Sequence, residues 1–116
     1  MELKNVKVFR NGRFLLENLH FEKTVSAVTP AEGDWDGRYV IPGLVDIHTH
    51  GAVGEDFSDG KPEGLQPLAN YYAAHGVTTC LATTMTLPER VLTPAMHAIR
   101  DFRRAGGAKC GGVHLE

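Results

Sequence analysis

Two histidines lie one residue apart in the segment GLVDIHTHG, residues 43–51. In an extended chain successive side chains point to opposite faces, so positions two apart share a face. Asp46, His48 and His50 therefore share one face of this segment, and the residues between them form an apolar face. A strand that presents imidazoles on one face favours a metal site, because neutral imidazoles are ligands for Zn²⁺ and Fe²⁺.

A second segment, GGVHLE at residues 111–116, shows the same alternation. His114 and Glu116 share one of its faces, so a carboxylate joins the set of metal ligands. Because neighbouring strands lie about 5 Å apart, ligands on two such strands could share one or two ions. We therefore predict that His48, His50 and Glu116 bind a divalent metal, Zn or Fe.

An HxH pair by itself is more often a surface pair or a hydrogen-bonded core histidine than a ligand set. A single inward carboxylate likewise often does no more than accept hydrogen bonds. The surroundings favour the metal here, because Pro42-Gly43 precede the pair, Gly51 follows it, and a second strand ends in Glu116. A motif counts only in its predicted structural context, and this context is present.

The elements that position these residues differ between the two parts of the chain. Residues 1–40 show short apolar runs separated by polar turns, with no helical period, and Asn11-Gly12 is a strong hairpin signal. A domain boundary is predicted near Pro42-Gly43, so that the two domains cover residues 1–41 and 42–116.

After this boundary the pattern alternates between strands and helices. The predicted elements are a strand at about 40–48, a glycine-rich loop to residue 61, a helix near 62–75 ended by Gly76, a strand at 77–83, a helix from a capping box at 86–89 to about Ala105, and a strand at 111–116.

This alternation indicates an α/β fold with parallel strands. An open doubly wound sheet is one alternative, but GAVGEDF after the first strand is not the phosphate-binding GxGxxG pattern. We expect instead the opening strands and helices of a (β/α)8 TIM barrel, which needs eight strands and typically about 250 residues. In such a barrel His48 and His50 line the lumen at the C-terminal end of a strand, where active sites lie.

Composition narrows the class of protein. The net charge is −2 with no block of like charge, which argues against nucleic-acid or membrane partners. No apolar run is long enough for a membrane span, and the N-terminus lacks a signal-peptide pattern. Cys80 and Cys110 lack CxxC spacing and are expected to be free thiols in a reducing, cytoplasmic compartment.

The segment PGLVDIHTHG resembles the first-strand signature of the amidohydrolase superfamily. GAVGEDFSDG, YYAAHGVTTCLATTMT and GVHLE resemble the opening third of the N-acetylglucosamine-6-phosphate deacetylase family. The resemblance covers nearly the whole chain and is specific from Pro42 onward. It implies a metal-dependent barrel with a small β-sandwich built from both chain ends. Residues 1–41 would be the N-terminal portion of that sandwich, and residues 42–116 the first two βα units and third strand of an incomplete barrel.

By position, His48 and His50 match the metal ligands on the first strand of that family, and Glu116 matches the glutamate of its HLEGP segment. Asp46 and His114 are expected to orient an imidazole by hydrogen bonding. The general acid of the family, an aspartate, is expected beyond residue 116, so this chain would contain no catalytic residue. The chain is therefore expected to be an N-terminal fragment that is inactive alone.

Other polar residues are expected to lie outside the ligand set. We expect a solvated acidic loop at Glu55, Asp56 and Asp59, surface or helix-packing histidines at positions 20, 75 and 97, and a strand end at residues 83–86 that could line a sugar pocket.

The resemblance implies that the parent protein deacetylates N-acetylglucosamine 6-phosphate to glucosamine 6-phosphate and acetate in amino-sugar catabolism. The metal would activate water and polarise the acetamide carbonyl. Two alternatives remain: another amidohydrolase, dihydroorotase-like or adenine deaminase-like, or a non-catalytic metal-binding fragment. The unpaired edge of an incomplete barrel also predicts a homo-oligomer.

Overall fold

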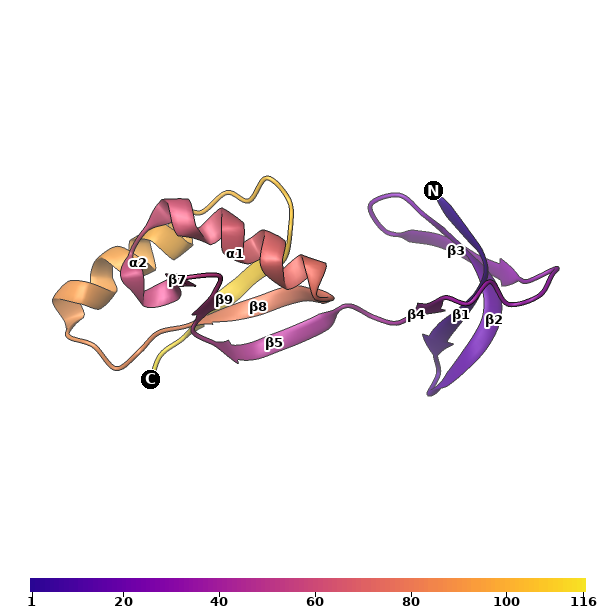
Figure 1. The fold of residues 1–116 in the computed structure, drawn as a ribbon, viewed down its shortest axis with the longest axis horizontal. Coiled ribbons are helices and arrows are strands. Elements are labelled where there is room, and N and C mark those ends of the chain that lie inside the picture. The colour runs from indigo at the N-terminus through magenta and orange to yellow at the C-terminus, as the bar shows by residue number, and fades with distance from the viewer. The chain divides into compact units, whose positions relative to one another are not determined.

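The computed structural model describes residues 1–116. The chain divides into two compact units, Met1–Pro42 and Gly43–Glu116 (Figure 1). The first unit contains only strands, and the second contains strands and helices in alternation.

The first unit is a four-stranded sheet in the order β3-β2-β1-β4. Its strands are β1 Glu2–Arg10, β2 Arg13–Phe21, β3 Val25–Pro30 and β4 Tyr39–Val40. The predicted hairpin at Asn11-Gly12 is confirmed: φ is 52° at Asn11 and 76° at Gly12. Positive φ at both central residues is the requirement of the two-residue turn whose twist suits an antiparallel hairpin.

One face of this sheet buries Val6, Val8 and Leu19. Beside them the guanidinium of Arg10 forms a two-pronged ion pair with the buried carboxylate of Glu17, which lowers the pKa of Glu17 chiefly through that hydrogen bonding.

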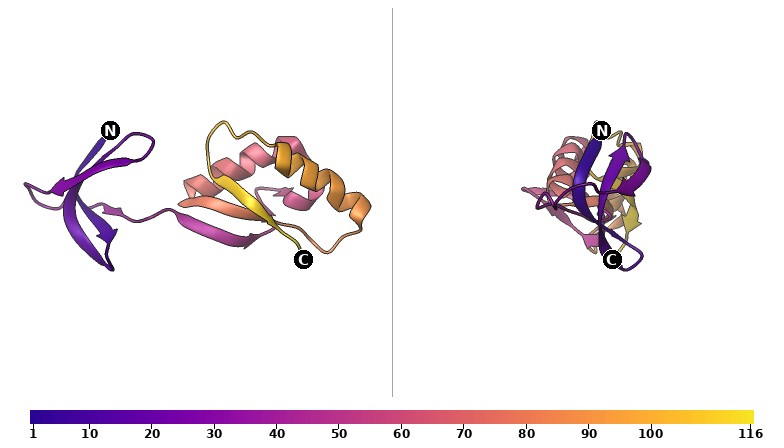
Figure 2. Two further views of the ribbon diagram at one scale, coloured as in Figure 1. Left: turned by 180° about the vertical axis from the view of Figure 1, so that it is seen from behind. Right: turned by 90° about the vertical axis from the view of Figure 1, so that its right-hand side faces the viewer.

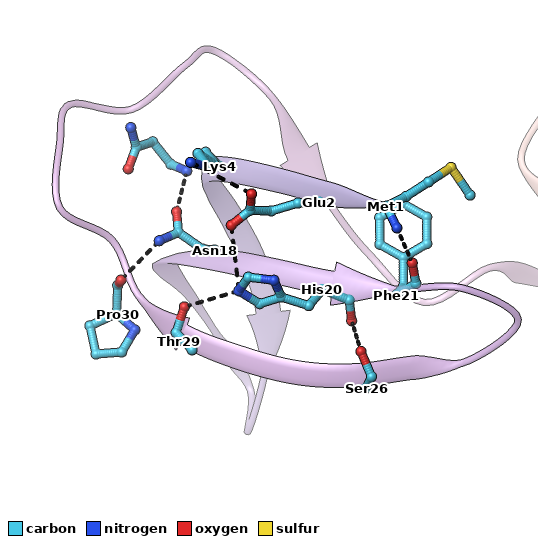
Figure 3. Close-up of polar contacts among 10 residues, drawn as sticks. Met1, Glu2, Lys4, Asn18, His20, Phe21, Ser26, Thr29 and Pro30 are labelled. Atoms are coloured by element: carbon cyan, nitrogen blue, oxygen red, sulfur yellow. Dashed lines mark hydrogen bonds and ion pairs between the residues drawn. The ribbon is translucent and has the colours of Figure 1, made fainter.

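Polar contacts fasten the chain start and the strand edges (Figure 3). The amino group of Met1 donates to the carbonyl of Phe21 at 2.7 Å, and Asn18 Nδ2 donates to the carbonyl of Pro30 at 3.1 Å. His20 Nε2 lies 3.4 Å from Thr29 Oγ1.

The second unit contains a parallel sheet in the order β5-β8-β9, with β5 Leu44–Thr49, β8 Val77–Thr83 and β9 Lys109–His114. Helices α1, Pro62–Ala74, and α2, Glu89–Asp101, lie on the same face of this sheet (Figures 1 and 2). The helix near 62–75 and the strand at 77–83 are confirmed, as is the end of the helix at Gly76, where φ is 82°.

An apolar core joins the helices to the sheet. Because side chains alternate along a strand, β8 sends Cys80 and Ala82 into this core. The buried members of the core are Phe57, Leu65, Leu68, Tyr72, Cys80, Ala82, Ile99 and Ala108.

The first strand of the second unit is shorter than predicted. Residues 40–48 do not form one strand, since Tyr39–Val40 pairs with β1 in the first unit and β5 begins only at Leu44. Pro42 lies between the two strands and has no amide proton to donate to a ladder.

Two helix boundaries also differ from prediction. The capping box at Thr86 is wrong, because α2 begins at Glu89 and no side chain caps it. Pro88 adopts an extended conformation with ψ 146°, and a proline disfavours helical backbone in the residue before it. Helix α2 ends at Asp101 rather than near Ala105, because Phe102 turns to extended backbone and packs against the core.

The predicted glycine-rich loop contains more regular structure than expected. A small hairpin, β6 Gly51–Ala52 with β7 Glu55–Asp56, directly follows β5, and a 3₁₀ turn, η1 Phe57–Asp59, follows the hairpin. The third strand starts two residues earlier than predicted, at Lys109, and ends at His114.

The mixed α/β class with parallel strands is confirmed. Helices α1 and α2 have 13 residues each, and neither could span a membrane.

Candidate metal centre

Strand β5 ends in the two histidines, and its pairing with β8 is irregular there. Asp46 is the partner of Cys80 and Thr49 is the partner of Ala82, so three steps along β5 are matched by two along β8. Such an extra residue is a β-bulge, which bends the strand and changes the direction in which its side chains point.

Strand β9 brings the carboxylate. Glu116 lies two residues beyond the end of β9, and in Figure 2 the C-terminus lies beside the end of β5. Although β8 separates β5 from β9 in the sheet, His114 Nδ1 lies 3.1 Å from the carbonyl oxygen of Ile47 on β5. The ends of the two outer strands therefore converge across the middle strand.

The three predicted ligands lie together. Glu116 Oε1 is 2.9 Å from His48 Nε2 and 3.8 Å from His50 Nε2. One ligand atom from each residue falls within 4.8 Å of the other two. Around a tetrahedral Zn²⁺, with bonds near 2.1 Å, ligand atoms are separated by about 3.4 Å. The donor types and their spacing thus fit one divalent ion with small adjustments of the side chains.

The centre is open to solvent on one side. The side chain of His48 is 50% exposed, and those of His50 and Glu116 are each 34% exposed. Nδ1 of His50 is buried and has no hydrogen-bond partner, so no acceptor in this chain selects the tautomer of that ring.

The two supporting residues have partners other than those expected. Asp46 Oδ1 accepts a hydrogen bond from the backbone amide of His48 at 3.1 Å, and it bonds to no imidazole. The ring of His114 lies edge-on to that of His48, with ring centres 4.8 Å apart. Its Nδ1 bonds to the backbone carbonyl of Ile47. His114 therefore contacts the metal centre through the packing of its ring against that of His48.

The remaining polar residues lie outside the ligand group. In the loop after β5, Asp56 caps the amide of Ser58 and Asp59 pairs with Lys61. Among the histidines, Nδ1 of His75 lies 2.8 Å from the carbonyl oxygen of Tyr71 and His97 is exposed on α2.

A buried network under the bulge was not found by pattern. The amide of Thr49 donates to Thr83 Oγ1 at 3.0 Å, and the hydroxyl of Thr49 lies 2.6 Å from that of Tyr72. Thr83 is fully buried and Tyr72 is 6% exposed. The only sequence signal was the β-branched run at 77–83, which predicts a strand but not the partner of any hydroxyl.

Burial also sets the acidity of two groups near the sheet. Loss of hydration raises the pKa of the Cys80 thiol to about 11. Burial likewise raises the pKa of Tyr72, and the hydrogen bond with Thr49 opposes that rise. Both side chains are therefore neutral near pH 7.

No family model matches the chain. It is 35% identical over 102 residues to the N-acetylglucosamine-6-phosphate deacetylase of Vibrio furnissii, which covers 80% of this chain and 26% of that relative. It is 36% identical over 83 residues to the N-acetylgalactosamine-6-phosphate deacetylase of Escherichia coli O157:H7, which covers 70% of this chain and 22% of that relative.

The fold is also similar to a solved structure. A mutant N-acetyl-D-glucosamine-6-phosphate deacetylase from Mycobacterium smegmatis, in complex with N-acetyl-D-glucosamine-6-phosphate, matches with a TM-score of 0.76 and 28% identity. The match covers 99% of this chain and 32% of that one. The chain therefore spans about a quarter to a third of the proteins it matches. It is a homologue of one segment of the N-acetylglucosamine-6-phosphate deacetylases, and the predicted resemblance to that family is confirmed.

Proposed function

We propose that this chain supplies part of the metal centre of an enzyme that removes the acetyl group from N-acetylglucosamine 6-phosphate. The observation that carries the proposal is the convergence of His48, His50 and Glu116, with ligand atoms within 4.8 Å of one another. The relatives named above are deacetylases of amino-sugar phosphates, and the M. smegmatis structure holds such a sugar.

In this proposal His48 Nε2, His50 Nε2 and one oxygen of Glu116 hold a divalent cation, Zn²⁺ or Fe²⁺. The bound cation would supply Lewis-acid polarisation of the acetamide carbonyl and activation of water. Two residues of the chain support this geometry: Asp46 accepts the backbone amide of His48, and His114 packs against the ring of His48. Three ligands account for one ion, and a second ion would need donors from outside this chain.

The protonation of the leaving amine needs a general acid, and we assign none to this chain. Two carboxylates near the histidines in sequence have other partners, since Asp46 accepts from a backbone amide and Asp56 caps η1. The acid is proposed to come from another part of the enzyme, and this chain is proposed to be inactive alone.

The sugar epimer is a second candidate within the same chemistry. The E. coli relative is named for N-acetylgalactosamine 6-phosphate, and its identity to this chain is within one percentage point of that of the Vibrio furnissii relative. The acetamide is common to both sugars, so a centre that acts on it does not by itself distinguish them.

The resemblance to the deacetylases also suggests an architecture for the whole enzyme. We propose that Gly43–Glu116 is the opening part of a (β/α)8 barrel and that Met1–Pro42 is part of a small β-sandwich. Apolar side chains on β5 are exposed, with Val45 at 61% and Ile47 at 65%, which favours contact of this strand with another copy of the chain, and we propose a homo-oligomer. Light scattering that shows a clean monomer would count against the oligomer.

A chimera tests the function. The chain replaces the matched segment of the Vibrio furnissii deacetylase, and acetate release from both sugar phosphates is measured. We expect turnover that falls by at least about 100-fold in His48→Ala, because one of the metal ligands is removed. The control, His97→Ala, changes an exposed histidine on α2 and should retain activity. Equal activity in His48→Ala and the parent chimera would refute the proposal.

A further inference from the structure

We propose that Thr83 is a positioning residue for the metal centre: its buried hydroxyl holds the amide of Thr49 and thereby fixes the spacing of His48 and His50. Tyr72 holds the side chain of the same threonine from α1. This inference rests on the proposed metal-binding function and goes beyond the ligand set.

The bulge creates the need for such a support. Between the paired residues Asp46 and Thr49 the ladder with β8 is out of register, so backbone partners are missing at this point. Side chains replace them: the carboxylate of Asp46 receives the amide of His48 at 3.1 Å, and the hydroxyl of Thr83 receives the amide of Thr49 at 3.0 Å. Two successive amides beside the first ligand thus depend on side-chain acceptors.

The hydrogen bond to Thr83 is the better protected of the two. Thr83 is fully buried, so water cannot take the place of its hydroxyl, whereas the side chain of His48 is half exposed. The amide of Thr49 lies in a partly buried hydrogen bond, and losing its acceptor costs free energy unless the backbone moves to find another. Such a movement would occur between the two imidazoles and would change their separation.

The other side of Thr49 is held as firmly. Its hydroxyl is 2.6 Å from the hydroxyl of Tyr72, a core residue on α1. Thr49 is therefore anchored by its amide to β8 and by its side chain to the helix layer. Thr49 lies between the two histidines, so fixing its position restricts the positions of His48 and His50 on either side of it.

The test measures metal affinity and coordination in the 116-residue chain. Thr83→Val removes the hydroxyl and keeps the branched shape of the side chain. We expect the affinity for Zn²⁺, measured by competition with a chelating indicator, to fall roughly 10-fold or more, and the visible absorption bands of the Co²⁺-loaded chain to shift. Thr83→Ser keeps the hydroxyl and should restore both readouts to wild-type values.

Thr78→Val is the matched control. Thr78 lies on the same strand, and its hydroxyl also bonds to β5, to the carbonyl of Leu44 at 3.4 Å, but at the end away from the histidines. This variant should leave the Zn²⁺ affinity and the Co²⁺ spectrum unchanged. If Thr83→Val does not fold, Tyr72→Phe takes its place, because it removes the second anchor of Thr49 and keeps the ring in the core.

The outcomes separate the two proposals. Wild-type binding with an equal affinity and spectrum in Thr83→Val overturns the positioning role and leaves the proposed function standing. A loss in Thr83→Val that Thr83→Ser fails to rescue also overturns it, because the hydroxyl would then not be responsible. A wild-type chain that binds no Zn²⁺ overturns the proposed metal site, and with it this inference.

Discussion

At the scale of single residues, alternation along extended chain located the three side chains that converge. His48 and His50 share a face because they are two residues apart, and this needs no knowledge of the rest of the fold. The partners of the supporting residues could not be predicted in this way. Asp46 bonds to a backbone amide and His114 to the carbonyl of Ile47, because a bulge and the approach of β9 to β5 decide what each side chain can reach.

The two cysteines differ in burial, and this difference predicts different reactivity of their thiols. Cys80 is 3% exposed and its pKa is raised to about 11, so at pH 8 the reactive thiolate is almost absent. Cys110 is only partly buried. We expect a thiol reagent at pH 8 to modify the native chain at Cys110 and to reach Cys80 only after denaturation.

Two variants show which cysteine the thiol reagent modifies. Cys110→Ser should remove the fast phase in the native protein, and Cys80→Ser should leave its rate unchanged. Rapid modification of native Cys110→Ser would contradict the buried position of Cys80.

At the scale of elements, strong local signals placed α1, β8 and the hairpin between β1 and β2. Where a boundary depends on tertiary contacts, the sequence pattern misplaced it. Phe102 continues the apolar stripe of α2 but leaves the helix to pack against the core. The hairpin β6–β7 was missed because its turn has Val53, a β-branched residue, at φ 51°, where turn statistics favour asparagine or glycine.

The connection between α2 and β9 tests how closely the elements pack. Gly107 has φ 81°, and a Cβ placed on it would lie 2.6 Å from the backbone of Ala69 in α1. The next residue, Ala108, donates its amide to the carbonyl of Ala69 at 2.8 Å, so this contact ties the connection to the helix. We expect Gly107→Ala to lower the free energy of unfolding by roughly 1–3 kcal/mol in urea denaturation.

The neighbouring glycine is the control for this substitution. A Cβ on Gly106 would meet nothing within 4 Å, and its φ is not in the left-handed region. Gly106→Ala should therefore leave the unfolding midpoint nearly unchanged or slightly raised. Equal effects of the two substitutions would mean that the contact with α1 is not as close as described.

At the scale of the whole molecule, strand and helix alternation predicted a parallel α/β sheet, and the resemblance of three motifs predicted the family. The alternation could not show how many strands complete the fold, because this chain spans about a quarter to a third of its relatives. It could not predict either that the ring of His114 reaches the carbonyl of Ile47 across β8, because this contact depends on how the three strands pack together.

The central claim is that His48, His50 and Glu116 hold a divalent ion, and equilibrium dialysis of the chain against Zn²⁺, followed by elemental analysis, tests it most directly. We predict one equivalent of zinc per chain, reduced to background in the double variant His48→Ala/His50→Ala and strongly weakened in Glu116→Gln. His97→Ala should retain the full equivalent. A wild-type chain without zinc, or one whose zinc survives the loss of both histidines, would contradict the account.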